Sequence, residues 1–290
     1  MSEAPGALRR WVLAARPRTL PAALVPVAVG AGVVRPAAIA WLNTVLCVVV
    51  ALALQIATNY ANDYSDGRRG TDEQRVGPFR LTASRLVAPE RVHQAAWVFF
   101  GVAAGAGLWL SARTSWWLVA LGASAIAAGW LYTGGPRPYG YYGYGELFVL
   151  VYFGFVATLG TAYVQSHGVS AAAWWWGLAA GAMACALLEA NNLRDVDGDR
   201  AAGKHTLAAR LGRERGSWLF TGFVVAVVAG ALAAREPLVA LVALVAYAPG
   251  VRVAFSPRRG RDLLVLLRYS SRAQLVVGAA ALVAFAARGS

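Results

Sequence analysis

The strongest constraint on the fold is a succession of nine mostly apolar stretches along the chain. A helix needs about 20 such residues to cross a lipid bilayer. Because the chain is 58% hydrophobic and only 14% charged, it is too apolar for a soluble domain of 290 residues. We therefore expect an all-α, polytopic membrane protein made of a single domain, residues 1–290. Its nine transmembrane helices are expected at residues 19–34, 38–60, 92–111, 114–132, 146–165, 170–190, 215–233, 237–254 and 272–288.

Basic residues are distributed unevenly between the connections of these spans. If successive spans alternate in direction, the N-terminus and every second connection hold all but four of the 27 Lys and Arg residues. Since cytoplasmic connections carry the excess of Lys and Arg, we predict a plasma (inner) membrane protein with a cytoplasmic N-terminus and an external C-terminus. This orientation accounts for the net charge of +13 without nucleic acid as a partner. The basic rim also favours anionic lipids or a diphosphate substrate.

The segment before the first span, residues 1–18, is predicted to lie along the cytoplasmic surface of the bilayer. A helix with one apolar and one basic side binds at a membrane interface. Here the apolar side would carry Leu8, Trp11, Val12 and Ala15, and the basic side Arg9, Arg10 and Arg16. This interfacial amphipathic segment would serve either as an anchor or as part of a substrate site.

Two similar polar motifs, 129 positions apart, each follow an apolar span. The first is Ala61-Asn62-Asp63-x-x-Asp66 and the second is Ala190-Asn191-Asn192-x-x-Asp195. On a helix, one face would carry Asn59, Asn62 and Asp66 in the first case, and Asn191, Asp195 and Asp199 in the second. Carboxylate and amide oxygens suit Mg²⁺, which completes its octahedron with waters and phosphates. The absence of His and Cys from both faces disfavours zinc.

These acids have a plainer explanation, in which they are solvated loop residues paired with neighbouring arginines. Charged groups at the ends of membrane spans are costly and usually functional, and the duplication of the motif favours a site. We therefore expect a central cavity, closed by two cytoplasmic cap loops at residues 61–91 and 190–215. Asp63 points elsewhere on its helix and is expected to orient its neighbours or to cap them.

Cations and aromatic residues in the connections complete the predicted site. Lys204 is the only lysine among the 27 basic residues, and a compact ammonium group binds phosphate oxygens as a point charge. The connection between residues 132 and 144 is rich in Tyr and Gly and contains one arginine. Such tyrosines are common in the aromatic belt of membrane proteins, but among turn-forming residues they favour the wall of a site. The residues concerned are Tyr132, Arg137, Tyr139 and Tyr141.

With these spans and motifs the chain resembles the UbiA-type intramembrane prenyltransferases, which have nine transmembrane helices and two aspartate-rich motifs. The likeness covers nearly the whole chain. Three groups of motifs, in order, resemble the 1,4-dihydroxy-2-naphthoate polyprenyltransferase branch of that family. They are AlaAsnAspTyrSerAspGly with GlyThrAsp and ArgValGlyPro, then TyrThrGlyGlyPro with ProTyrGlyTyr, and AsnAsnLeuArgAsp with GlyLysHisThrLeuAlaAlaArgLeuGly.

The resemblance implies transfer of a polyprenyl chain from its diphosphate to dihydroxynaphthoate, with release of diphosphate and CO₂, to give demethylmenaquinone. It implies that Mg²⁺ is the cofactor. The implied metal ligands are Asn62, Asp66, Asp195 and Asp199, with Asp72 as a further acid. Many members of the family have the third acid of the first motif at the position that is Gly70 here, two residues before Asp72. Lys204 joins the first four as a catalytic residue. The expected substrate-binding residues are Asn59, Arg68, Arg75, Tyr132, Arg137, Tyr139, Tyr141, Asn191, Asn192 and Arg194, and Arg68, Arg75 and Arg80 are also candidates for a lid.

Three alternatives stay open at this stage. The same chemistry can serve another acceptor, either a different aromatic compound or a phosphosugar. A cation-coupled transporter is disfavoured because the acids gather at one end of the spans, whereas transporter sites lie near the midplane. A phosphatidyl-alcohol transferase would need a single tight aspartate cluster. Within the prenyltransferase hypothesis, the chain length of the donor would depend on how far a tunnel extends along the spans.

Overall fold

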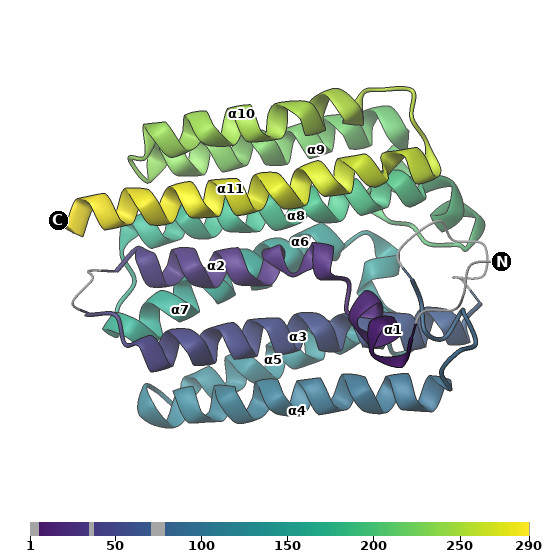
Figure 1. Ribbon diagram of the computed structural model, residues 1–290, viewed down its shortest axis with the longest axis horizontal. Helices are drawn as coiled ribbons and strands as arrows, with labels where there is room; N and C mark the ends of the chain where they lie inside the picture. Colours follow the sequence, from purple (N-terminus) through teal and green to yellow (C-terminus); the bar gives the residue numbers. More distant parts are fainter. Residues whose placement is uncertain (1–5, 35–37, 71–78, 290) are drawn as a thin grey trace.

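The computed structural model describes residues 6–34, 38–70 and 79–289. Over these ranges the chain forms helices and no strands, as the sequence predicts (Figure 1). In chain order the α-helices are α1 (Ala7–Ala14), α2 (Pro21–Gly32), α3 (Trp41–Arg68), α4 (Pro89–Arg113), α5 (Trp117–Leu131), α6 (Gly145–Val149), α7 (Ala157–Ser166), α8 (Ala171–Ala201), α9 (Leu207–Ala233), α10 (Pro237–Ala254) and α11 (Leu264–Gly289). Four shorter elements join them: η1 (Pro17–Thr19), η3 (Tyr139–Tyr142), the π-helix η4 (Leu150–Val156) and η5 (Gly260–Leu263).

Seven of the helical segments in the described ranges are long and apolar enough to cross a membrane. An eighth candidate is broken, because the segments Ala7–Thr19 and Pro21–Gly32 meet at an angle of 55°. The segment 114–132, expected to be a span, forms the shorter apolar helix α5. The chain is therefore a multi-pass membrane protein, and its count of nine spans stays a prediction.

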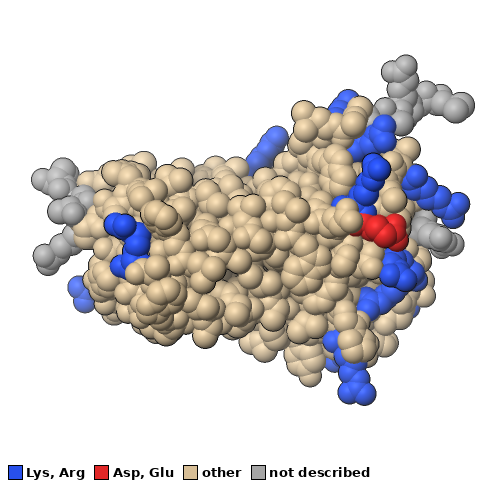
Figure 2. All heavy atoms as spheres, turned by 90° about the horizontal axis from the view of Figure 1, so that it is seen from below, with Lys and Arg blue, Asp and Glu red and all other residues tan. Residues whose placement is uncertain are grey.

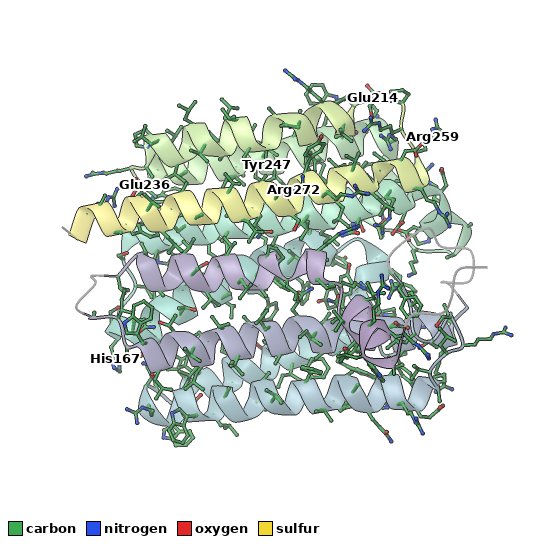
Figure 3. All side chains as sticks on the ribbon, in the orientation of Figure 1. His167, Glu214, Glu236, Tyr247, Arg259 and Arg272 are labelled. Carbon is green, nitrogen blue, oxygen red and sulfur yellow. The ribbon has the colours of Figure 1, made fainter. Side chains whose placement is uncertain are left out.

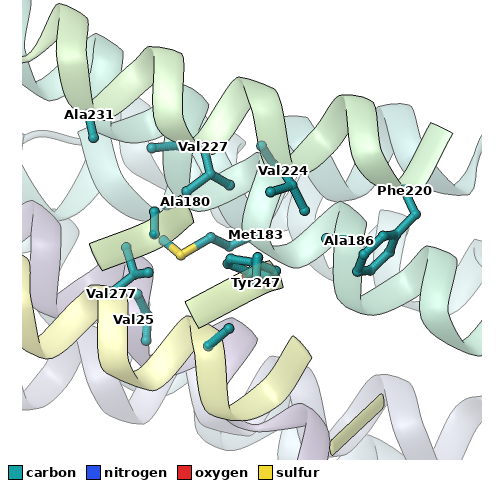
Figure 4. Close-up of a cluster of buried hydrophobic side chains, with 14 of the residues drawn as sticks. Val25, Ala180, Met183, Ala186, Phe220, Val224, Val227, Ala231, Tyr247 and Val277 are labelled. Carbon is teal, nitrogen blue, oxygen red and sulfur yellow. The ribbon is translucent and has the colours of Figure 1, made fainter. Parts of the chain in front are cut away.

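The long helix α8 lies at the centre of the molecule. It packs against α9 and also contacts α2, α11 and η4, whereas α3 packs against α2, α4 and α5 on the other side (Figure 1). Small residues make this arrangement possible, since much of the buried face of α8 is alanine and glycine. The largest core cluster joins α8 to α9, α10, α11 and α2, and Met183 of α8 lies beside Tyr247 of α10 at its centre (Figure 4).

Glycine contacts bring η4 close to α8. A Cβ atom built on Gly154 would lie 2.6 Å from the carbonyl oxygen of Gly177 and 2.7 Å from the Cα of Gly181. No residue with a side chain fits at Gly154 without separating the two helices. The span predicted at 146–165 is built from three consecutive helical segments, α6, the π-helix η4 and α7.

The two ends of the helix bundle differ in charge. In Figure 2 most of the visible Lys and Arg side chains gather at the end where α1 lies, and the flank beside them is nearly free of charge. Glu214 and Arg259 lie at this basic end, whereas His167 and Glu236 lie at the opposite end (Figure 3). Large apolar side chains such as Trp109, Leu238 and Val283 are exposed, as expected where lipid replaces water.

The helix α1 is attached to α3 through its backbone. Asn59 donates a hydrogen bond of 2.9 Å to the carbonyl oxygen of Ala15, and Tyr60 donates one of 3.0 Å to that of Trp11. Leu8 and Val12 of the predicted apolar side are exposed. The amphipathic helix is thus present, but it ends before Arg16, which takes a left-handed conformation with φ 54°.

The predicted boundaries of the cap loops need a correction. Residues 61–68 form the last turns of α3, and residues 190–201 form the last turns of α8. Both helices continue because the motifs contain no proline and one face of each motif is buried among neighbouring elements. The buried residues include Asn62, Asp66, Asp195 and Asp199. The two acidic motifs therefore lie on helices, and the loops begin after them.

Candidate active site

Asp66 of α3 is the most heavily contacted acid of the first motif. Its Oδ1 atom lies 3.0 Å from the Nζ of Lys204 and accepts a hydrogen bond of 2.5 Å from the hydroxyl of Tyr141. The guanidinium of Arg80 lies 3.8 Å from its Oδ2 atom. Asp66 is only 2% exposed, so these partners compensate a carboxylate that has lost most of its hydration. The structure thus brings together Asp66, Lys204 and Tyr141, three residues that the sequence singled out separately.

The other polar residues of the first motif fix its surroundings. The Oδ1 of Asn62 accepts a hydrogen bond of 2.7 Å from the hydroxyl of Thr133, which ties α3 to the tyrosine-rich connection. Asp63 accepts hydrogen bonds from the backbone N–H groups of Leu81 at 2.7 Å and Thr82 at 3.0 Å. Asp63 therefore orients the segment that carries Arg80, in agreement with the orienting role expected for it.

The second motif has a different arrangement. Arg194 donates two hydrogen bonds to the adjacent Asp195, at 2.7 Å to Oδ1 and 2.6 Å to Oδ2, and a third of 2.9 Å to Asn191. Asp199, one turn further, accepts a weaker hydrogen bond of 3.3 Å from Thr206. Both acids are 5% exposed. A bidentate arginine pair of this kind is strong and directional.

Lys204 links the two motifs. Its backbone N–H donates a hydrogen bond of 2.7 Å to the carbonyl oxygen of Asp199 at the end of α8. Its ammonium group reaches Asp66 of α3 and lies 4.5 Å from the centre of the Tyr141 ring. Lys204 is 6% exposed, so its charge is directed into the protein between the two motifs.

Asn192 faces away from this junction. It donates a hydrogen bond of 2.8 Å to the Oε1 atom of Glu146, at the start of α6. Glu189, three residues before Asn192 on α8, is buried as well, as is Glu146. Neither glutamate was expected at the site. Asn192 is therefore placed to hold α6 against the second motif, and its predicted contact with substrate stays a prediction.

A cavity of about 300 Å³ extends from the two motifs into the bundle. Its polar end is lined by Asn62 and Asn191, one from each motif, together with Arg16, Gln55 and Asn59. The remaining wall is apolar and comes from α2, α3, α4, α5, the segment from α6 to α7, and α8. The expected central cavity is thus present, with polar chemistry at one end and a long apolar compartment beyond it.

Two of the predicted tyrosines line this cavity. Tyr132 and Tyr139 pack edge to face with ring centres 5.4 Å apart, and the Tyr139 ring stacks on Phe148 at 3.9 Å. Burial raises the pKa of Tyr139. The hydroxyl of Tyr139 therefore stays protonated, and it donates a hydrogen bond of 2.9 Å to the carbonyl of Ala128. The aromatic faces are held rigidly at the junction between polar and apolar regions.

Other predicted residues lie elsewhere. Arg68 is exposed and donates a hydrogen bond to Tyr64. Arg137 is also exposed and does not line the cavity. Asp72 and Arg75 lie outside the described residues. The roles proposed for these four residues from the sequence stay predictions.

The sequence-based prediction omitted Arg69 from the site and gave Arg16 and Arg80 other roles than the structure does. Arg16 lines the polar end of the cavity, although the sequence placed it on the basic side of an interfacial helix. Arg80, considered only for a lid, is 8% exposed and lies beside Asp66. Arg69 donates hydrogen bonds to the carbonyl oxygens of Thr133 and Gly135. Proline at position 17 was an available signal for Arg16, since it ends the preceding helix and redirects the chain.

The acidic and amide side chains of the two motifs are the candidate ligands for a magnesium ion. In the part of the chain that the structure describes, no three acidic, imidazole or thiol groups come together as a metal site. Mg²⁺ is commonly bound through one or two carboxylates plus substrate phosphates. Asp66 of the first motif, or Asp195 or Asp199 of the second, with the amide of Asn62, has the donor chemistry of that pattern, because the diphosphate itself would supply the missing oxygens.

Several known proteins resemble this chain in sequence. Residues 23–263 match the model of the UbiA prenyltransferase family. The chain is 48% identical over 278 residues to a 1,4-dihydroxy-2-naphthoate octaprenyltransferase of Mycobacterium tuberculosis, covering 92% of this chain and 93% of the relative. It is 37% identical over 216 residues to the enzyme of that name from Escherichia coli, covering 70% and 68% of the two chains.

Two solved structures share the fold. A UbiA homolog from Archaeoglobus fulgidus bound to GPP and Mg²⁺ has a TM-score of 0.71 at 13% identity, covering 96% of this chain and 99% of that chain. The apo structure of a UbiA homolog from Aeropyrum pernix has a TM-score of 0.68 at 17% identity, covering 92% and 96%. The fold, the paired acidic motifs and the sequence match lead to one conclusion: this chain belongs to the UbiA prenyltransferase family.

Proposed function

We propose that this protein transfers a polyprenyl group from polyprenyl diphosphate to 1,4-dihydroxy-2-naphthoate, a step of menaquinone biosynthesis. The observation that carries the proposal is the junction of Asp66, Lys204 and Asp199, next to a long apolar cavity. The polar end of that cavity is lined by Asn62 and Asn191, and Asp66 follows Asn62 by one helical turn. The donor has an anionic diphosphate, which suits the polar junction, and an apolar prenyl chain, which suits the cavity. The names of the relatives at 48% and 37% identity support naphthoate as the acceptor.

In the proposed reaction, the allylic C–O bond of the donor breaks and its electron pair leaves with diphosphate. The carboxylated carbon of the naphthoate ring, made electron-rich by two hydroxyls, forms the new C–C bond. Loss of CO₂ returns the C–C electron pair to the ring, so no oxidant is needed. The product is the reduced form of demethylmenaquinone.

The polar residues would stabilise the leaving diphosphate. When bound, Mg²⁺ would neutralise charge on the phosphate oxygens, and Asn62, Asp66, Asp195 and Asp199 are the residues that would hold it. Lys204 and Arg194 are buried beside these acids and supply cations for the charge that grows as the C–O bond breaks. Arg80 approaches from the loop side of Asp66. The ligand role of Asp72 and the substrate role of Arg75 belong to the same proposal.

The cavity wall would protect the allylic cation. Tyr132 and Tyr139 present aromatic faces at its polar end, and such faces attract cations. The apolar wall beyond them excludes the water that would otherwise capture the cation. Arg16 also lines the polar end of the cavity, and its guanidinium would bind the carboxylate of the acceptor. The chain's own contribution is therefore mainly positioning and charge stabilisation.

We also propose the orientation in the plasma (inner) membrane that the sequence predicts. The end of the bundle that carries α1 and most visible basic side chains (Figure 2) would face the cytoplasm, with the motifs and N-terminus. The C-terminus, at the opposite end (Figure 1), would lie outside.

The direct test is turnover by purified protein in detergent with Mg²⁺, dihydroxynaphthoate and octaprenyl diphosphate, followed by mass spectrometry of the lipid product. We expect the prenylated naphthalenediol and one CO₂ for each diphosphate released. Turnover of only another aromatic acceptor or a phosphosugar would keep the family chemistry and reject naphthoate. No turnover with any acceptor, but cation flux in proteoliposomes, would favour the transporter.

A further inference from the structure

Three glycines in three different helices line the apolar part of the cavity: Gly107 of α4, Gly122 of α5 and Gly160 of α7. A Cβ atom built on each of them would meet no neighbouring atom within 4 Å. There is therefore open space in front of each of these residues, which a side chain would occupy.

These glycines lie near the end of the cavity that is remote from the acids. That end is formed by a cluster of apolar residues, Val27, Cys47, Leu110 and Val164, against which Leu118 packs. Each glycine is one helical turn from a member of this group and on the same face: Gly107 from Leu110, Gly122 from Leu118 and Gly160 from Val164. Together they line the section of the cavity next to this cluster.

The cavity is long enough for this section to matter. Its lining on α3 extends from Asn62 to Cys47, a length of about 22 Å at the 1.5 Å rise per residue of an α-helix. An allylic diphosphate held at the acids would place its first isoprene units beside Tyr132 and Tyr139. Only the later units of a longer chain would reach the glycines.

Helix packing does not account for these glycines. Gly154 shows what a packing glycine looks like, since its Cβ atom would lie within 2.7 Å of atoms of α8. Gly107, Gly122 and Gly160 have no such neighbour, although glycine is a poor helix former compared with alanine. Resting on the proposed function, we propose that these three glycines determine the donor chain length by leaving room for the distal isoprene units of a long prenyl chain.

The experiment compares two donors, geranyl diphosphate and octaprenyl diphosphate, in Gly107→Leu, Gly122→Leu and Gly160→Leu. The measured quantity is the ratio of kcat/KM for the long donor to that for the short donor. We expect the ratio to fall about tenfold or more in each variant, because added methylenes fill space that only the long chain needs. Gly→Ala at the same positions should give a smaller fall.

Gly105→Leu is the matched control. Gly105 lies two residues from Gly107 on α4 and also has open space before its Cβ, but it does not line the cavity. Its ratio should equal that of the unmodified protein. An unchanged ratio in the three cavity variants, with both donors turned over by the unmodified protein, would overturn the inference and leave the proposed function intact. If the unmodified protein turned over neither donor, the proposed function would fail and the inference with it.

Discussion

The two acidic motifs look alike in sequence but are stabilised in different ways. Asp66 on α3 receives its partners from distant parts of the chain: Arg80, Tyr141 and Lys204. Asp195 on α8 is paired with Arg194, its immediate neighbour. The α3 half of the site therefore exists only when three connections have folded over it, whereas the α8 half is largely complete within one helix.

This difference has a consequence for binding. A diphosphate that arrives at the α3 half meets groups carried by the loops, so its binding and the order of those loops are coupled. At the α8 half, the guanidinium of Arg194 is held by Asp195 and Asn191 and loses little freedom when a phosphate binds. We infer that the α8 half is preorganised within its own helix, whereas the α3 half depends on the connections that carry Arg80, Tyr141 and Lys204.

The largest expected effect is that of metal removal. Because no three-acid cluster is present in the described ranges, Mg²⁺ should bind weakly to the free protein and strongly in the presence of diphosphate. Chelation by EDTA should abolish turnover, and added Mg²⁺ should restore it. Isothermal titration with Mg²⁺, with and without pyrophosphate, measures the coupling. Equal affinity in both titrations would mean that the site is preformed.

Next in size are Asp66→Asn and Asp195→Asn. Each should lower kcat by about 10²- to 10³-fold, since each removes a carboxylate that helps to stabilise the leaving group. Asp66→Asn should also loosen the connections around it, which limited proteolysis can detect, while Asp195→Asn should not. Exposed Asp197→Asn is the control on α8. Full turnover in either variant would contradict the assignment of these acids as metal ligands.

Lys204→Gln should have a somewhat smaller effect, about 10- to 10²-fold in kcat, because Arg80 still lies beside Asp66. Since Lys204 links the motifs, its loss should weaken pyrophosphate binding as well. Arg215→Gln removes one positive charge from an exposed position of α9 and serves as the control. If both variants lost activity equally, the effect would come from net charge and not from the position of the ammonium group.

Tyr141→Phe removes only the hydroxyl that donates to Asp66. Mutation of a residue that hydrogen-bonds to a metal-binding carboxylate commonly lowers metal affinity by about tenfold or more. The Mg²⁺ concentration needed for half-maximal rate should therefore rise by about tenfold. Tyr142→Phe, at an exposed neighbouring residue, should leave it unchanged. A fall in kcat at saturating Mg²⁺ would show instead that the hydroxyl acts in the chemical step.

The smallest expected effect concerns Glu146, which supports the α8 half through Asn192. Glu146→Ala should lower turnover by about two- to tenfold, as expected for one lost hydrogen bond of 0.5–1.5 kcal/mol. Glu146→Gln keeps an oxygen that can accept from Asn192, so it should restore most of the activity. Equal loss in both variants would show that the negative charge, and not the hydrogen bond, is what matters.

Much of this organisation could be predicted from periodicity alone. The apolar stretches predicted the helical membrane fold, and the spacing of Asn62 and Asp66 correctly placed them on one face of a helix. By the same geometry Arg68, two positions after Asp66, stands about 200° around the helix from it, and its contact with substrate stays a prediction. Lys204 was found because it is the only lysine.

The remaining features depend on contacts that no local pattern encodes. Arg16 and Arg80 are two arginines among many, and only the folded chain brings one to the cavity and the other to Asp66. Likewise, the π-helix η4 has no signal in its own sequence and packs against α8. Gly154 hints at a close approach, but its partners on α8 lie more than 20 positions away in sequence.

The attachment of α1 determines how the N-terminal segment can change over time. Asn59 and Tyr60 donate to the carbonyl oxygens of Ala15 and Trp11, and every residue type presents such an oxygen. Side chains add to the attachment, because the Trp11 ring packs edge to face on Tyr60, and Asn59 also donates to the hydroxyl of Thr19. Mutation should therefore be tolerated at Leu8 and Val12, whose side chains are exposed, and less so at Trp11 and Thr19. Among natural variants, the placement of this segment should outlast the identity of its exposed residues.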